Sequence, residues 1–295
     1  MYKNVDLFFE PRKRCIQEND WPKSEPEMTD FESAFLCGLI RYKRPRKIVE
    51  VGVAGGGTTA IILKCLELLN IQDTCEVYSV DKLEKFYRGH GEPTGYLAEK
   101  SLNRKDVKFK HTFLFGKLLP EVLDEIGNDI DFVILDTEHS VPGEILDFLA
   151  VLPYLKQSAC VVLHDLAANH IGRNHEAYVT QLLLSCVVAD KYLNFSDDRN
   201  LGYPNIGAFD VNTETREHIA DVFLCLLITW YKIKSEDVYQ KYIYFYKSHY
   251  STELTSLFEK IYHIQVNTCH KKKKKLHFVP LKSLWKYIKT HLFIF

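Results

Sequence analysis

Short runs of β-branched residues recur along the chain, and stretches with helical periodicity separate them. The run Lys47–Val51 leads into the glycine-rich turn Gly52–Gly57, and the runs Glu76–Val80 and Ile130–Leu135 each lead into an aspartate. Runs that are apolar throughout, rather than alternating, are typical of parallel strands buried on both faces. The pattern therefore predicts an α/β fold with a doubly wound, mostly parallel sheet.

The rest of the chain contains further expected helices and strands. Thr29 and Glu32 form a capping box at the start of a helix that we expect to end near Pro45. Further strands are expected near 107–112, 159–163 and 206–211, and helices near 118–126 and 143–155. The chain after Asn212 reads as helical, over 214–230, 236–246 and 253–263. We therefore divide the chain into a loosely structured lead-in (1–28), an α/β domain (29–212), a helical extension (213–270) and a basic tail (271–295).

The formal net charge of −1 is the sum of an acidic main part and a basic C-terminal segment. The segment 271–295 has eight lysines and no acid, so the first 270 residues hold 30 basic and 39 acidic side chains. An acidic body does not suit a general nucleic-acid binder, because phosphate neutralisation needs a clustered basic face. The tail also has an amphipathic stripe that includes Leu281, Trp285 and Ile288, which favours peripheral contact with an anionic membrane; partner docking and self-packing remain alternatives.

Other features point to the cytoplasm. No apolar run is long enough to span a membrane, and the N-terminus lacks the core of a signal peptide. Eight cysteines are scattered without a C-x-x-C pair, and most lie in apolar stretches. We expect them to be reduced, buried thiols.

The turn after the first strand has the composition of a nucleotide-type site. Its glycines let backbone amides approach a ligand, and the helix that follows begins near Thr58, where its amides favour negative charge. Asp81 ends the second strand, where it is positioned for ribose hydroxyls. The G-x-G-x-x-G pattern of dinucleotide-binding sites is not present directly after the strand, although a match with similar spacing begins later, at Gly55. The spacing Glu50-x-Gly52-x-x-x-Gly56-x-Thr58 instead resembles the first motif of class I S-adenosylmethionine-dependent methyltransferases.

Two further strand ends carry acids and histidines. Asp136-x-x-His139 follows the fourth strand and His164-Asp165 follows the fifth. Ends of adjacent parallel strands lie about 5 Å apart, so these side chains should converge. Two carboxylates and an imidazole suit a divalent ion such as Mg²⁺ or Mn²⁺.

These motifs, from about Thr29 to Asp165, extend the resemblance to the catechol O-methyltransferase-like and macrolide-sugar O-methyltransferases. The resemblance implies a Rossmann-like class I methyltransferase fold, with Glu50, Gly52, Gly56, Thr58 and Asp81 binding S-adenosyl-L-methionine. It implies that His139 is the catalytic base. It also implies metal ligands at Asp136 and Asp165 with His164 beside them, although the resembled enzymes carry an acid where this chain has His164. The Tyr203-Pro204-Asn205 turn is a candidate for the acceptor pocket.

The resulting hypothesis is an O-methyltransferase that acts on a hydroxyl of a carbohydrate or of a cell-surface glycan precursor. An NAD-type oxidoreductase on the same kind of fold is the second enzymatic reading. A non-catalytic, membrane-associated glycan-assembly protein is the third. The resemblance also suggests a homo-oligomer.

Overall fold

The computed structural model describes residues 2–21, 27–89, 91–103, 107–171, 175–195, 204–231 and 235–276. Within them, one sheet has the strand order β3-β2-β1-β4-β5-β7-β6. Its strands are β1 (Lys47–Val51), β2 (Glu76–Asp81), β3 (Lys110–Phe115), β4 (Ile130–Leu135), β5 (Leu155–His164), β6 (Asp190–Tyr192) and β7 (Ile206–Asp210). The first five strands pair in parallel, and β7 pairs antiparallel with both β5 and β6. The predicted doubly wound, mostly parallel sheet is confirmed.

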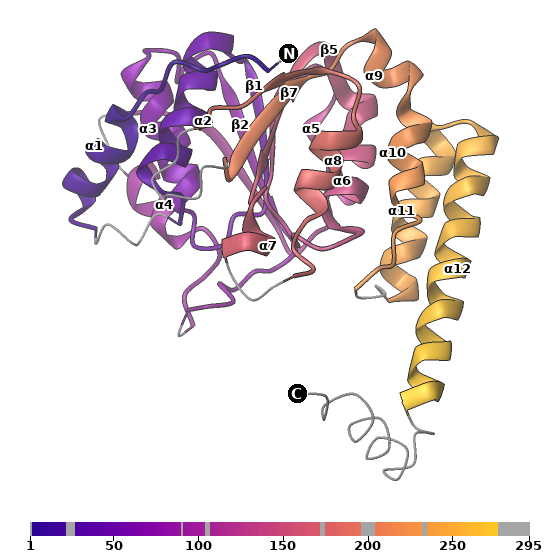
Figure 1. The fold of residues 1–295 in the computed structure, drawn as a ribbon. Helices are drawn as coiled ribbons and strands as arrows, with labels where there is room; N and C mark the ends of the chain where they lie inside the picture. Colours follow the sequence, from indigo (N-terminus) through magenta and orange to yellow (C-terminus); the bar gives the residue numbers. More distant parts are fainter. Residues whose placement is uncertain are drawn as a thin grey trace, which may run out of the picture.

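Alternate strand residues face opposite layers of helices, as strand geometry requires. Ile48 and Ile134 pack on the layer formed by α1 (Glu10–Asn19), α2 (Asp30–Lys43), α3 (Gly57–Leu68) and α4 (Tyr96–Leu102). Val49 and Val133 pack on the other layer, with α5 (Leu123–Ile126), α6 (Gly143–Val151) and α8 (Val179–Cys186). Figure 1 shows the two layers on either side of the sheet.

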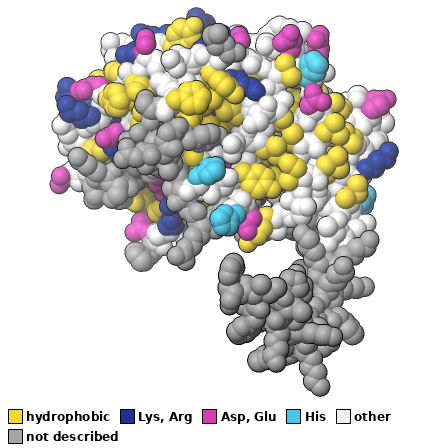
Figure 2. Space-filling model, viewed as in Figure 1, with side chains coloured by type: hydrophobic (Ala, Val, Ile, Leu, Met, Phe, Trp, Pro, Cys, Tyr) yellow, Lys and Arg dark blue, Asp and Glu magenta, His cyan; other side chains and the backbone are white. Residues whose placement is uncertain are grey.

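The C-terminal helices form a third layer outside α6 and α8 (Figure 1). They are α9 (Thr213–Glu217), α10 (Ile219–Cys225), α11 (Glu236–His249) and α12 (Thr252–Leu276). Tyr242 and Tyr246 of α11 are buried and donate hydrogen bonds to Asp147 Oδ1 (2.7 Å) and the Leu146 carbonyl oxygen (2.9 Å) of α6. The layer thus shares one hydrophobic core with the sheet. Figure 2 shows hydrophobic side chains gathered on the side of this layer that faces the viewer. Leu224, Leu227 and Tyr231 are exposed large hydrophobic residues in and after α10.

Two predicted segments were wrong. The lead-in contains helix α1, in which Pro11 occupies the first turn, where the missing amide hydrogen costs nothing. Its Cys15 is fully buried and donates from Sγ to the Ala60 carbonyl oxygen of α3 at 3.3 Å. The helix expected over 214–230 is broken at His218, and α10 ends at Cys225. After this helix end, the buried Gln265 side chain donates hydrogen bonds to the carbonyl oxygens of Leu226 (3.0 Å), Leu227 and Ile228.

The predicted basic tail falls mostly outside the described residues. Helix α12 continues through the lysines at 271–275, which were predicted to belong to the tail. Residues 277–295, which contain the amphipathic stripe, are not among those described. Tyr203 of the predicted acceptor turn also lies outside the described residues. None of the helices described is both long enough and apolar enough to cross a bilayer.

Candidate active site

A cavity of about 700 Å³ opens at the carboxyl ends of β1, β2, β4 and β5. This is the edge at which open α/β sheets bind ligands. The glycine turn and the start of α3 form one wall, and the segments after β2, β3, β4 and β5 form the others. The lining side chains with polar or ionisable groups are Glu27, Thr58, Asp81, Lys82, Tyr87, Arg88, Lys117, Asp136, Thr137, Glu138, His139, Asp147, His164, Asp165 and Tyr242.

Gly52 and Gly56 allow the turn to pack closely against other parts of the chain. Both have positive φ angles, +95° and +86°. A Cβ atom on Gly52 would lie 1.8 Å from the carbonyl oxygen of Asp136, and one on Gly56 would lie 2.8 Å from Cα of Gly95. Gly52 lines the cavity and Gly56 does not. Both glycines are therefore required by backbone packing, whatever the cavity binds.

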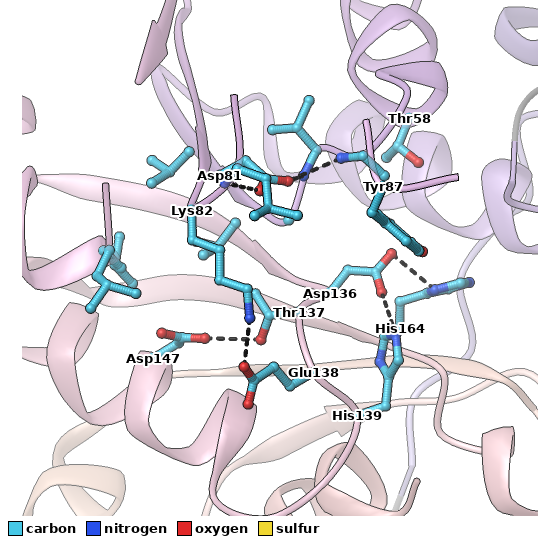
Figure 3. A pocket seen from close by; sticks show the side chains of 18 of the residues that line it. Thr58, Asp81, Lys82, Tyr87, Asp136, Thr137, Glu138, His139, Asp147 and His164 are labelled. Carbon is cyan, nitrogen blue, oxygen red and sulfur yellow. Dashed lines mark hydrogen bonds and ion pairs between the residues drawn. The ribbon is translucent and has the colours of Figure 1, made fainter. Parts of the chain in front are cut away.

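Asp81 joins the turn to the end of β2. Its Oδ2 accepts hydrogen bonds from the backbone amides of Val53 (2.9 Å) and Ala54 (3.1 Å), and its Oδ1 accepts one from Leu83 (2.8 Å). Figure 3 shows the carboxylate beside the cavity, with Thr58 on the neighbouring helix. A carboxylate has about four acceptor positions, so Asp81 retains capacity for a ligand hydroxyl.

Glu50 does not line the cavity. Its side chain is completely buried behind the turn, where Oε2 accepts hydrogen bonds from Thr59 Oγ1 (2.6 Å) and Ser79 Oγ (2.8 Å). Burial raises its pKa to about 7, against the two hydroxyl hydrogen bonds, which favour the charged form. The acid that opens the motif therefore ties β1 to β2 and α3 in this structure.

Asp136, His139 and Asp165 converge as the sequence predicts. His139 Nε2 lies 3.8 Å from Asp136 Oδ1 and 3.5 Å from Asp165 Oδ2. Figure 3 labels His139 and Asp136. Both His139 and Asp165 have left-handed backbone conformations with φ of 58°. Non-glycine residues pay about 1 kcal/mol or more for this conformation, and such residues cluster at functional sites.

Glu144 holds His139 in place and was not predicted from the sequence as a site residue. Its carboxylate is fully buried at the start of α6 and accepts hydrogen bonds from the backbone amides of Thr137 (2.9 Å) and His139 (2.9 Å). Its Oε1 also lies 3.3 Å from His139 Nδ1. Burial opposes a charge on His139, but the bond to Glu144 and the acids Asp136 and Asp165 outweigh it and raise the His139 pKa to about 9. The only sequence signal was an acid in the first turn of a helix, which usually indicates a cap.

The opposite end of the cavity contains residues from the extension. Asp147 accepts hydrogen bonds from Thr137 Oγ1 (2.9 Å) and from Tyr242 OH (2.7 Å). Lys82 and Glu138 form an ion pair of 2.6 Å between the segments after β2 and β4. In Figure 3 Asp147 and the Lys82–Glu138 pair lie below Asp81 and to the left of His139 and His164. Nothing in the local sequence around Tyr242 indicated that α11 reaches the cavity.

Residues 49–166, about two fifths of the chain, match the family model described as "Methyltransferase domain". The chain is also similar to the O-methyltransferase TomG of Streptomyces achromogenes, solved with S-adenosylmethionine (17% identity, TM-score 0.47), over 70% of this chain and 92% of that one. It is similar to a Bacillus cereus O-methyltransferase solved with S-adenosylhomocysteine (15% identity, TM-score 0.48), over 69% and 91% of the two chains. No curated protein matches the chain. Residues 49–166 are therefore similar to a methyltransferase domain, and the cavity lies at the strand ends of this region.

Proposed function

We propose that the chain is an S-adenosyl-L-methionine-dependent O-methyltransferase that acts on a hydroxyl of a carbohydrate or of a cell-surface glycan precursor. The observation that carries this proposal is the single cavity that joins the glycine turn and Asp81 to the His139 cluster. One end offers amides and an acid for an adenosine-containing molecule. The other end offers a histidine and two carboxylates for a hydroxylated acceptor.

The residues present fit the proposed cofactor. Thr58 and Gly57 lie at the amino end of α3, where backbone amides favour a carboxylate. Asp81 has acceptor capacity for ribose hydroxyls. When bound, S-adenosylmethionine supplies a methyl group on a positively charged sulfur, which is already activated for displacement.

The main work of the protein is then to orient the acceptor and to remove its proton. His139 Nε2 accepts the hydroxyl proton as the acceptor oxygen forms its bond to the methyl carbon and the carbon–sulfur bond breaks. Glu144 holds the His139 backbone amide, and its Oε1 lies 3.3 Å from Nδ1 of the ring. Asp136 and Asp165 accept hydrogen bonds from neighbouring hydroxyls of the acceptor, which favours a diol such as a sugar. Tyr87 lines the cavity, is 64% exposed and offers an aromatic face to a sugar ring.

A transfer assay tests the proposal. The full chain is incubated with methyl-labelled S-adenosylmethionine and, separately, with nucleotide sugars, free sugars and catechol. We expect label to appear on a sugar hydroxyl. Transfer to catechol alone would contradict the carbohydrate acceptor, and transfer to none of these acceptors would contradict the proposed substrate class.

A further inference from the structure

The cavity extends past Asp81 toward the β3 edge of the sheet, away from His139. Its lining there comes from the segments that follow β2 and β3, including the start of the short 3₁₀ helix η1 (Leu119–Glu121). The apolar side chains that line the cavity at the ends of these two strands are Val80, Leu83, Leu118 and Leu119. Such walls suit the two apolar faces of a flat ring system.

Asp147 of α6 is a buried polar group that lines the cavity, and its side chain is oriented from two sides. Its Oδ2 accepts a hydrogen bond from Thr137 Oγ1 (2.9 Å), and its Oδ1 accepts one from Tyr242 OH (2.7 Å). Burial, together with the nearby Asp147, raises the pKa of Tyr242 well above its ordinary value, so the phenol keeps its proton and acts as the donor. Two hydroxyl groups from different elements therefore fix the orientation of one carboxylate.

Tyr242 belongs to the C-terminal extension, outside the residues 49–166 that match the family model. Its side chain is 1% exposed. Its neighbour Lys241 places Nζ 3.0 Å from Glu121 Oε1, so α11 also contacts η1. Tyr246, one turn further along α11, donates a hydrogen bond to the Leu146 carbonyl oxygen of α6 at 2.9 Å. Helix α11 is thus held against two elements that border the cavity, and it supplies a residue that the matched region does not contain.

The position of this part of the cavity indicates which portion of the proposed cofactor it receives. Asp81 is the candidate partner of the ribose hydroxyls, and the adenine ring is attached to the same ribose. Adenine has two apolar faces and a 6-amino group that donates hydrogen bonds. A buried carboxylate accepts a hydrogen bond from such an amino group, but it repels a carbonyl oxygen at the same ring position. The arrangement therefore favours adenine over hypoxanthine, its 6-oxo counterpart.

We propose that the C-terminal extension is part of the cofactor site, with Tyr242 orienting Asp147 so that its carboxylate recognises the 6-amino group of adenine. This inference rests on the proposed function, because it assigns residues to the base of the same cofactor. Asp147 is the group that contacts the base, and Tyr242 is a positioning residue that acts through Asp147. The extension thereby determines which base the cavity accepts, in addition to packing on α6.

Base selectivity provides the test, because it is a binding measurement that needs no acceptor. The full chain is titrated by calorimetry with S-adenosylhomocysteine and with S-inosylhomocysteine, in which a carbonyl oxygen replaces the 6-amino group. We expect the wild type to bind S-adenosylhomocysteine at least about tenfold more tightly. In Asp147→Asn, whose amide can donate a hydrogen bond to the carbonyl oxygen, the two affinities should lie within about threefold. Equal affinities in the wild type, or the wild-type preference in a folded Asp147→Asn, would overturn the proposal.

Two tyrosine variants separate orientation of Asp147 from packing of the extension. Tyr242→Phe removes the hydrogen bond to Asp147 and should lower the preference for S-adenosylhomocysteine at least about threefold. Tyr246→Phe is the matched control, because Tyr246 is equally buried on α11 and also donates to α6 but does not line the cavity. It should keep the wild-type preference within about twofold. An unchanged preference in Tyr242→Phe, or the same loss in both variants, would overturn the proposal. If Asp147→Asn does not fold, shown by its circular dichroism spectrum, this pair of variants decides.

The same titrations distinguish failure of this inference from failure of the proposed function. A wild type that binds S-adenosylhomocysteine without preference over S-inosylhomocysteine contradicts the role of Asp147 and Tyr242 and leaves the proposed cofactor intact. A wild type that binds neither compound contradicts the proposed cofactor, and this inference with it.

Discussion

Replacing His139 with alanine is expected to lower the methyl-transfer rate by about 10²- to 10⁴-fold, the usual contribution of a general base. The reason is geometric, because His139 Nε2 lies near both Asp136 and Asp165, and Glu144 holds the His139 backbone amide with a hydrogen bond. The measurement is single-turnover transfer at saturating cofactor. His218→Ala is the control, since His218 is an exposed histidine outside the cavity. Wild-type rates for His139→Ala would exclude the base role.

His139 also determines how the methyl-transfer rate should depend on pH. A pKa raised to about 9 means that the imidazolium form predominates at pH 7 and that the base form appears as the pH rises. The wild-type rate should therefore increase about tenfold per pH unit from pH 7 and level off near pH 9. His139→Ala should lose this rise. A wild-type rate that is flat over this range would contradict the assignment.

Replacing Gly52 with alanine is expected to reduce the free energy of unfolding by more than about 3 kcal/mol. Its Cβ would lie 1.8 Å from the Asp136 carbonyl oxygen and 2.7 Å from the carbonyl carbon, both rigid backbone atoms, and the φ angle is +95°. The turn would have to move away from β4. The measurement is the urea unfolding midpoint followed by tryptophan fluorescence.

Gly127→Ala is a matched control for the backbone conformation alone. Gly127 has a φ angle of +75°, and only Lys47 Nζ, at 3.9 Å, lies near its added Cβ. Because its φ of 75° and ψ of 176° lie in a region that only glycine normally adopts, this variant should lower the free energy of unfolding by about 1 to 3 kcal/mol, less than Gly52→Ala. If the two variants unfold at the same urea concentration, the close approach of the turn to Asp136 is not what requires a glycine at position 52.

Sequence reasoning located the strands and the site because both depend on local patterns. Runs such as Ile130–Leu135 are buried on both faces, so their composition alone reports a parallel sheet. Asp136 and Asp165 follow adjacent parallel strands, so their convergence follows from the strand order. The capping box at Thr29 was also correct.

The residues that sequence reasoning missed act over long distances in the chain. Glu32 was assigned only its local role in the capping box, yet its carboxylate also faces His164 of β5. Tyr242 reaches Asp147, 95 positions earlier, because the extension packs on α6. The lead-in helix was missed for a different reason, since the prolines were read as breaks although Pro11 lies in the first turn.

The most direct test of the central claim, that this cavity binds S-adenosylmethionine, is a calorimetric titration of the full chain with S-adenosylhomocysteine and, separately, with NAD. We expect one site for S-adenosylhomocysteine, no detectable binding of NAD, and at least tenfold weaker S-adenosylhomocysteine binding in Asp81→Ala, because the Asp81 carboxylate lies at the cofactor end of the cavity. Binding of NAD without binding of S-adenosylhomocysteine would contradict the account.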